Sequence, residues 1–275
     1  MNSIAAKPAE LTQDLYDVSP LTGTFGAQIN GIDLSVPLGE AGARHIRELL
    51  RQYKVLVFRD QFSVGPKELL AFAEHFGVPE AGEHPTHASV PGLPGVKVLH
   101  SNAEGLEALN PDSWHTDGST RKLTRCLSIL QAIDIPPFGR DTLFADMEAV
   151  YDRLSKPMRT LLDGLTAEHS WKSQKPGAPT VMHPVVLQDE VNGRKALYVN
   201  KTYTCSINEM RPDESEAMLQ FLYRQTHVPE IQLRVNWKPG SIVMWDNEKT
   251  QHYLVFDKAY NRIMHRVMLF DDILS

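Results

Sequence analysis

The chain has 275 residues, of which 42% are hydrophobic and 23% charged, and its formal net charge is −6 at pH 7. A chain of this length can bury a substantial core, and an acidic chain without a basic run is a poor partner for nucleic acid or an anionic membrane surface. It has no run of about 18 apolar residues, no secretory pattern in its first residues and only two, widely separated cysteines, which together predict a cytoplasmic protein with reduced thiols.

The first predicted elements are two helices around one short strand. Residues 41–52 and 66–76 carry apolar side chains at helical spacing, and residues 55–58 form an apolar run typical of a buried strand. The following residues 77–95 are rich in Gly, Pro, His and Ser, and long connections of this kind often carry function. We interpret them as a candidate lid.

Three further helices are predicted from their capping residues. Asp146 and Ser155 are candidate caps of two consecutive helices that end near Gly164. Asp213, with Glu216 three residues later, resembles a capping box that opens a third helix.

The predicted strands cluster in the second half of the chain. A hairpin is expected over 185–199, with its turn at an Asn-Gly pair, and further strands over 231–237, 242–245 and 262–270. Late strands with helices between or before them fit a mainly β fold with flanking helices, a double-stranded β-helix or distorted jelly roll. No linker-like segment divides the chain, so we expect residues 1–275 to form a single domain.

His115 and Asp117 are candidate metal ligands separated by one residue. In an extended segment their side chains project from the same face and can reach one ion, with His252 as the candidate third ligand. Roughly one His-x-Asp or His-x-Glu triplet is expected by chance in this composition, so the spacing alone is weak. Two histidines and one carboxylate are the ligand set of non-haem Fe(II) oxygenases, whereas a structural zinc site closes its shell, usually with thiolates.

Arg262 and Arg266 lie in a segment with the composition of a strand. Their i, i+4 spacing puts both guanidinium groups on one face, about 13 Å apart along the chain. The same face carries Met264, Met268 and Phe270, so a bound carboxylate or sulfonate would relieve two charges among apolar neighbours. The alternative is a solvated face of an edge strand.

Taken together, these motifs resemble the family of Fe(II)/2-oxoglutarate-dependent oxygenases that includes taurine dioxygenase and 2,4-dichlorophenoxyacetate dioxygenase. The resemblance runs over nearly the whole chain. The matching segments are, in order, Pro20-Leu-Thr-Gly-x-Phe-Gly-Ala27, Gly31-Ile-Asp-Leu34, Val55-Leu-Val-Phe-Arg-Asp-Gln61, Trp114-His-Thr-Asp117, Asp141-Thr142, His183-Pro-Val-Val186, Leu197-Tyr-Val-Asn200, Trp245-Asp-Asn-x-x-Thr-Gln-His252 and Arg262-Ile-Met-His-Arg266.

The resemblance implies a jelly-roll fold and a site for Fe(II), 2-oxoglutarate and O2. His115, Asp117 and His252 match the residues that bind Fe(II). Arg262 matches the arginine that pairs with the distal carboxylate of 2-oxoglutarate, and Thr142 matches the hydroxyl that assists it.

Three more residues match substrate-binding positions of the family. Arg266 matches the arginine that holds the acidic end of the substrate in taurine-type enzymes, His84 a substrate-contacting histidine and Tyr203 a pocket-lining aromatic residue. A loop position for His84 and a core position for Tyr203 are the alternatives. The chain departs from many relatives at Gly118-Ser-Thr120, where they place an aromatic residue, so that wall of the pocket is expected to be built differently.

The resemblance therefore implies hydroxylation of a small, anionic organic substrate such as a sulfonate, a sulfate ester or an aryloxyalkanoate, with release of succinate and CO2. Asp117 stands where the halogenating branch of this chemistry has a small residue, which favours hydroxylation. Hydroxylation of an amino acid or a biosynthetic intermediate is an alternative. A metal-dependent hydrolase and a non-catalytic metal-binding jelly roll are others, although neither needs Arg262 and Thr142 together. By analogy with relatives, assembly of the protein into a homo-oligomer is compatible with this interpretation.

Overall fold

Two facing β-sheets make the centre of the molecule. The computed structural model describes residues 16–82, 87–101, 114–122, 125–172, 175–255 and 261–270. The larger sheet has nine strands, and their spatial order is β1 (Asp17–Pro20), β2 (Ala27–Asn30), β3 (Val55–Phe58), β15 (Ile242–Asp246), β7 (Cys126–Asp134), β17 (Arg262–Phe270), β6 (Leu93–Ser101) and β5 (Ser89–Val90), with β4 (Val78–Pro79) also paired to β17.

The smaller facing sheet carries one of the candidate metal ligands. Its order is β14 (Gln232–Val235), β8 (Thr142–Asp146) and β16 (Thr250–Leu254). A buried cluster between the two sheets draws on both of them, with Val57, Val243 and Met264 from the larger sheet and Phe144 and Leu233 from the smaller. Two sheets closed over one such core form a double-stranded β-helix, the distorted jelly roll that the sequence predicts.

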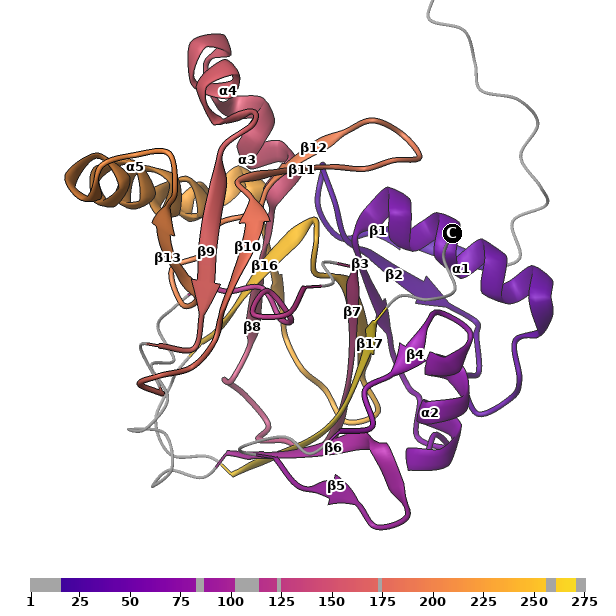
Figure 1. The fold of residues 1–275 in the computed structure, drawn as a ribbon. Helices are drawn as coiled ribbons and strands as arrows, with labels where there is room; N and C mark the ends of the chain where they lie inside the picture. The colour runs from indigo at the N-terminus through magenta and orange to yellow at the C-terminus, as the bar shows by residue number, and fades with distance from the viewer. Residues whose placement is uncertain are drawn as a thin grey trace, which may run out of the picture.

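Strand residues that alternate with this inner core face outward and are covered by two helices. The helices α1 (Gly39–Tyr53) and α2 (Pro66–Glu74) contribute Ile46 and Phe72 to a second core, which Leu56, Met244 and Val267 complete from the sheet. Figure 1 shows these two helices on the outer side of the larger sheet. Alternation of inward and outward side chains therefore gives each central strand two buried faces.

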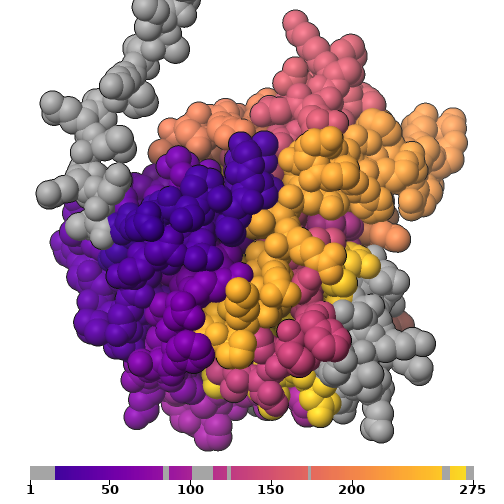
Figure 2. All heavy atoms as spheres, turned by 180° about the vertical axis from the view of Figure 1, so that it is seen from behind, coloured from indigo at the N-terminus to yellow at the C-terminus, as the bar shows by residue number. Residues whose placement is uncertain are grey.

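The remaining helices gather on the opposite side of the molecule (Figure 1). They are α3 (Met147–Arg153), α4 (Lys156–Leu162) and α5 (Pro212–Arg224), and short 3-10 turns follow α5 at Gln225–His227 and Pro229–Ile231. They pack in a third core with the small sheets β10 (Thr180–Pro184), β9 (Thr166–Ser170), β13 (Thr204–Ile207) and the hairpin of β11 (Val186–Gln188) with β12 (Lys195–Leu197). Seen from behind, the indigo and purple N-terminal segments fill one side and orange segments from the last third lie against them (Figure 2).

Most of the predicted elements are confirmed, including the caps Asp146 and Ser155 and the hairpin. Helix α5 begins earlier than predicted, because Pro212 occupies its first turn and Glu214, rather than Glu216, accepts a hydrogen bond from the Arg211 backbone N–H. The segment 77–95 is not an irregular connection throughout. It contains β4, β5 and the start of β6, which satisfy backbone groups at the edge of the larger sheet.

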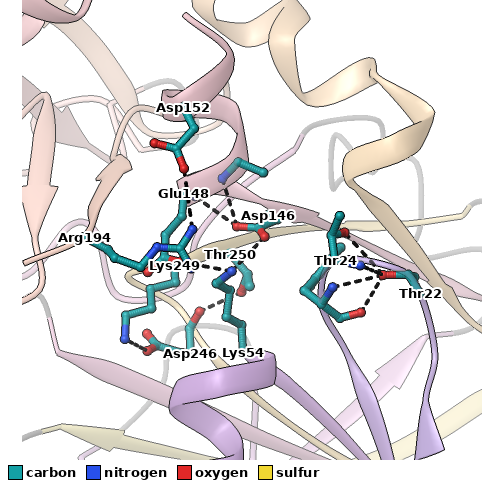
Figure 3. A network of polar contacts seen from close by, with 12 residues as sticks. Thr22, Thr24, Lys54, Asp146, Glu148, Asp152, Arg194, Asp246, Lys249 and Thr250 are labelled. Carbon is teal, nitrogen blue, oxygen red and sulfur yellow. Dashed lines mark hydrogen bonds and ion pairs between the residues drawn. The ribbon is translucent and has the colours of Figure 1, made fainter. Parts of the chain in front are cut away.

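A buried network of charges ties α1 to α3 (Figure 3). Lys54 follows α1 with a left-handed backbone, φ 65°, and its Nζ lies 2.7 Å from Asp146 Oδ2 and 3.0 Å from Glu148 Oε2. Arg194 Nη1, from the hairpin side, lies 2.9 Å from the same Glu148 oxygen. Asp146 also caps α3 by accepting hydrogen bonds from two backbone N–H groups. Because the side chains of Lys54, Asp146 and Glu148 are almost completely buried, loss of one partner would leave an unpaired charge in the interior.

None of the helices in the described part of the chain is long and apolar enough to cross a membrane.

Candidate metal centre and anion sites

The backbones of His115 and His252 lie side by side as an isolated antiparallel bridge. The His115 N–H donates to the His252 carbonyl at 3.0 Å, and the His252 N–H donates back at 2.8 Å. His252 belongs to β16, which pairs with β8 so that His252 lies opposite Phe144. The two imidazole rings have centroids 4.0 Å apart. Pairing of distant segments therefore brings the two histidines together.

Asp117 completes a group of three ligand atoms that lie within 4.8 Å of one another. Its Oδ1 is 4.0 Å from His115 Nε2 and its Oδ2 is 4.0 Å from His252 Nε2. The chain turns at the next residue, Gly118, with φ +77°, where a Cβ would lie 3.1 Å from Cys126 Sγ. Any other residue there would be strained and crowded, so glycine allows Asp117 to face the histidines.

The protonation states of these groups suit metal binding. Burial, with repulsion from His115, lowers the pKa of His252 to about 3, so its imidazole is neutral at pH 7. Burial opposes ionisation of Asp117, but attraction to His252, Arg266 and His115 and a hydrogen bond from Ser128 hold its pKa well below the usual range. A neutral imidazole and a carboxylate are the forms that bind a divalent ion.

Threonine side chains form hydrogen bonds to backbone carbonyl groups in and next to the segments that carry the histidines. Thr116 Oγ1, between the first two candidate ligands, donates to the Thr250 carbonyl at 3.0 Å. Thr250 Oγ1 in turn donates to the Asp246 carbonyl at 2.7 Å, and the Asp246 N–H donates to the Lys54 carbonyl at 3.0 Å. Hydrogen bonds thus connect the buried charge network around Lys54 to the backbone beside the candidate metal centre. Figure 3 shows Thr250 and Asp246 next to this network.

Arg262 and Thr142 both contact Trp237. Trp237 Nε1 donates to Thr142 Oγ1 at 3.0 Å, and the guanidinium carbon of Arg262 is 5.3 Å from the centre of a Trp237 ring. Arg262 Nη1 donates to the Arg140 carbonyl at 3.1 Å, while its buried Nε has no hydrogen-bond partner among the described residues. Burial and repulsion from Arg140 lower the pKa of Arg262 to about 9. A buried cation with an unpaired donor fits the carboxylate of a small ligand.

Arg266 projects from the same strand toward the candidate ligands. Its Nη1 is 3.8 Å from Asp117 Oδ1, and only 9% of the residue is exposed. Strand β17 therefore places one arginine beside Trp237 and the other beside the candidate metal ligands, as the i, i+4 spacing predicts. Neither side chain lies on a solvated face, so the edge-strand alternative is wrong for both.

Two aromatic rings lie in sequence beside His115, first that of Tyr203 and then that of Trp171. Tyr203 lies edge-on to His115, with ring centroids 6.0 Å apart, and Trp171 lies 4.9 Å from Tyr203. Trp171 Nε1 donates to Thr120 Oγ1 at 2.8 Å. Thr120 stands in the segment where the sequence departs from many relatives, and an indole from another part of the chain supplies an aromatic group there. His84 lies outside the described residues.

Sequence reasoning missed several residues that contact the candidate ligands. Ser128 donates to Asp117 Oδ2 at 2.9 Å, and Asn247 Oδ1 accepts from the Asp117 backbone N–H at 3.1 Å. Trp237 and Trp171, described above, were likewise missed as parts of the anion site and the aromatic wall. Only Asn247 had a local signal, since it lies in the same motif as His252.

Comparisons with known proteins agree with this geometry. The sequence matches the family model described as "Taurine catabolism dioxygenase TauD, TfdA family" over residues 17–268. An alpha-ketoglutarate-dependent sulfonate dioxygenase of Saccharomyces cerevisiae is 35% identical to it over 262 residues, which cover 87% of this chain and 63% of the yeast protein. The chain therefore spans less than two thirds of that relative's length.

Other matches cover most of both proteins. An alpha-ketoglutarate-dependent sulfate ester dioxygenase of Pseudomonas putida is 33% identical, with 92% of this chain and 89% of that protein covered. Among solved structures, a taurine dioxygenase from Burkholderia xenovorans superposes with a TM-score of 0.84 at 33% identity, with 94% of this chain and 90% of that chain covered.

Proposed function

Because the chain belongs to the TauD, TfdA family of dioxygenases, we propose that it hydroxylates a small organic anion, with Fe(II) and 2-oxoglutarate, in one catalytic domain of residues 1–275. It is an oxidoreductase whose named relatives depend on alpha-ketoglutarate. The observation that carries the proposal is the meeting of two histidines and one carboxylate beside a strand with two buried arginines. We further propose that it acts in the cytoplasm.

His115, Asp117 and His252 would hold the iron. Their ligand atoms lie within 4.8 Å of one another, and two imidazoles with one carboxylate leave three positions of an octahedron for exchangeable ligands. When bound, iron supplies the coupled chemistry in which O2 oxidatively decarboxylates 2-oxoglutarate to succinate and CO2 and gives one oxygen atom to a C–H bond. The protein supplies ligand placement and a site largely closed to water.

Arg262 and Thr142 would bind the distal carboxylate of 2-oxoglutarate. Arg262 offers a charged donor without a partner among the described residues, and Thr142 presents a hydroxyl that already accepts a hydrogen bond from Trp237. The Thr142 proton is therefore available for donation to an anion. Both residues contact Trp237, and the proposal requires that one carboxylate reaches both of them.

Arg266, Tyr203 and, in the undescribed part of the chain, His84 would bind the substrate. A sulfonate or sulfate group suits the planar guanidinium of Arg266, which lies next to Asp117 and hence next to the candidate metal site. The apolar part of the substrate would then lie against Tyr203 and Trp171. Anchoring the anion at Arg266 orients a nearby C–H bond toward the metal ligands.

The names of the relatives suggest what the product does next. If the hydroxylated carbon also bears a sulfonate sulfur or a sulfate oxygen, the C–S or C–O bond breaks, the hydroxyl proton leaves and a carbonyl compound forms. The sulfur group is then released as sulfite or sulfate. We propose sulfonates and sulfate esters as the first substrates to test, since the named relatives act on these two classes.

Succinate formation tests the proposal. Purified protein would be incubated with Fe(II), ascorbate, 2-oxoglutarate and air, with alkyl sulfonates, sulfate esters, aryloxyalkanoates and amino acids as candidate substrates. We expect oxygen-dependent succinate, stimulated by a sulfonate or a sulfate ester, with an equal amount of oxidised product. Turnover of a sulfate ester without O2 would indicate a hydrolase, and folded, iron-loaded protein that forms no succinate would contradict the dioxygenase function.

A further inference from the structure

Asn247 is completely buried at the end of β15, and its side chain amide contacts four groups around Asp117. Oδ1 accepts from the Asp117 backbone N–H at 3.1 Å and from Trp245 Nε1 at 3.0 Å. Nδ2 lies 2.9 Å from Ser128 Oγ and 3.7 Å from Cys126 Sγ. An amide has two acceptor positions and two N–H groups, so every hydrogen-bonding position of Asn247 is used.

The direction of each hydrogen bond follows from this count. Two N–H donors converge on Oδ1, so the amide cannot be rotated to exchange its oxygen and nitrogen without losing both bonds. Nδ2 then donates to Ser128 Oγ, and the single hydroxyl proton of Ser128 is directed to Asp117 Oδ2 at 2.9 Å. Asn247 therefore acts on Asp117 in two ways. It accepts a hydrogen bond from the Asp117 backbone N–H, and it orients the Ser128 hydroxyl that donates to the Asp117 carboxylate.

We infer that Asn247, with Ser128 as its link, is the positioning residue that sets the place and the rotation of the Asp117 carboxylate for the metal ion. This inference rests on the proposed function, because it assigns the two residues to the iron site. Neither residue needs to touch the ion. With the Asp117 backbone and Oδ2 both held, each carboxylate oxygen stays 4.0 Å from a different histidine Nε2.

The local backbone explains why Asp117 needs such support. His115 is paired with His252, but Asp117 enters a turn with Gly118 and lies outside any strand of the described chain. The Asn247 side chain therefore provides the acceptor that a neighbouring strand would provide in a sheet. Ser128 lies opposite Trp245 in the pairing of β7 with β15, so the larger sheet fixes the relation between Ser128 and Asn247.

Asn247 itself is anchored by the same sheet. Its backbone N–H donates to the Cys126 carbonyl at 3.0 Å, and Trp245, which binds its Oδ1, packs with its ring centroid 5.1 Å from that of His252. The Asn247 amide thus contacts Ser128, which binds the Asp117 carboxylate, and Trp245, which packs against the His252 imidazole. Hydrogen-bonding partners of this kind orient metal ligands, and their removal lowers metal affinity about 10-fold to 100-fold.

The test is metal binding by variants that remove one link at a time. Ser128→Ala removes the bond to the carboxylate but leaves the amide contact to the Asp117 backbone, whereas Asn247→Ala removes the contact to the backbone and the donor that orients the Ser128 hydroxyl. Ser215→Ala is the matched control, because Ser215 is also a buried, hydrogen-bonded serine, which accepts from the Ile207 N–H at 2.8 Å, but lies in α5. Co(II) would be titrated anaerobically into metal-free protein, with calorimetry giving the dissociation constant and visible absorption the coordination geometry.

We expect Ser128→Ala and Asn247→Ala to raise the Co(II) dissociation constant at least about 10-fold and to change the visible spectrum. Ser215→Ala is expected to lower the melting temperature while its dissociation constant stays within about twofold of the parent value. If the residues act as one chain, the double variant will bind Co(II) no more than about threefold more weakly than Asn247→Ala alone.

The outcomes separate this inference from the proposed function. Parent protein that binds no Co(II) would overturn both. Parent protein that binds Co(II), together with a folded Ser128→Ala variant of unchanged affinity and spectrum, would overturn the positioning role alone. Should Asn247→Ala fail to fold, Ser128→Ala still decides the question, because it deletes only a hydroxyl.

Discussion

The backbones of His115 and His252 exchange both of their hydrogen bonds, at 3.0 and 2.8 Å. This bridge joins the first candidate ligand to β16 without using either imidazole. The bridge therefore uses only backbone groups of the two histidines, and their backbones are placed by the fold rather than by an ion. Positions that are set before binding reduce the entropy lost when the ion binds.

The first prediction concerns metal removal. Because the bridge and the three cores do not use the metal, treatment with a chelator should abolish succinate formation while the far-UV circular dichroism spectrum stays unchanged. Fe(II) or Co(II) at about 100 times its dissociation constant should then stabilise the protein by about 2.7 kcal/mol, or roughly 5–10 °C in melting temperature. Collapse of the secondary structure on chelation would contradict this account of the bridge.

The second prediction separates the two arginines of β17. Arg262→Ala should raise the dissociation constant of 2-oxoglutarate at least about 10-fold, since a hydrogen bond to a charged group contributes about 1.5–3 kcal/mol. Calorimetry with metal-loaded protein would measure it. Arg211→Ala is the control, because this surface arginine is 72% exposed and pairs only locally with Asp213 and Glu214. Equal 2-oxoglutarate affinity in the parent and Arg262→Ala would refute the assignment.

The third prediction is that Arg266→Ala uncouples the reaction. The variant should keep its KM for 2-oxoglutarate within about threefold but lose most of its stimulation by an anionic substrate, because the substrate carboxylate or sulfonate loses its charged partner. The ratio of oxidised product to succinate would fall below one. Parent-like coupling in this variant would exclude a substrate-binding role for Arg266.

The fourth prediction concerns pH and a histidine outside the candidate site. Burial and repulsion from His183 lower the pKa of His169 to about 3, and the ring stacks on Tyr198. The unfolded chain, with a histidine pKa near 6.5, binds the extra proton between these two values, so the free energy of unfolding should fall as pH is lowered from about 6.5 toward 3. This histidine contributes at most about 1.4 kcal/mol per pH unit.

His169→Phe keeps an aromatic ring but cannot be protonated. Urea unfolding of the metal-free protein between pH 5 and 7.5 should give a shallower dependence for this variant than for the parent, by up to one proton. Parallel curves for the two proteins would show that His169 is not protonated on unfolding in this range.

The fifth prediction addresses the buried charges. Lys54→Met should destabilise the protein by about 3–5 kcal/mol, because it leaves the buried carboxylates of Asp146 and Glu148 without their lysine. Lys195→Met is the matched control, since its Nζ also lies 2.7 Å from a carboxylate, that of Asp163, but at the surface, where such a pair contributes about 0–1 kcal/mol. Denaturant unfolding of both variants would measure the difference, and similar losses would contradict the importance of burial.

The sequence allowed much of the fold to be predicted because its signals are local. Alternation in 262–270 indicates both the strand and the shared face of Arg262 and Arg266, and the caps at Asp146 and Ser155 mark two helix starts. The metal ligands could be proposed because histidine and aspartate are chemically distinctive and the motifs around them resemble a known family.

Contacts between distant segments could not be predicted in the same way. Ser128 reads as an ordinary strand residue, and only the register of β7 against β15 brings it to Asn247. Trp237 likewise follows a strand with no local sign that it joins Thr142 to Arg262. These residues support the site through the fold, so their roles appear only when the strands are paired.

The placement of Arg262 and Arg266 on one strand makes the length of β17 as important as its composition. Met264 of this strand packs in the inner core between the two sheets, whereas Val267 and Leu269 pack in the helix-covered core, so the strand has side chains buried on both of its faces. Deletion or insertion of one residue between the arginines would point one guanidinium group into the helix-covered core and would bury its charge among apolar side chains. A substitution within this stretch changes one side chain and keeps the direction of the others. Insertion or deletion of a single codon would both remove an anion site and destabilise the protein.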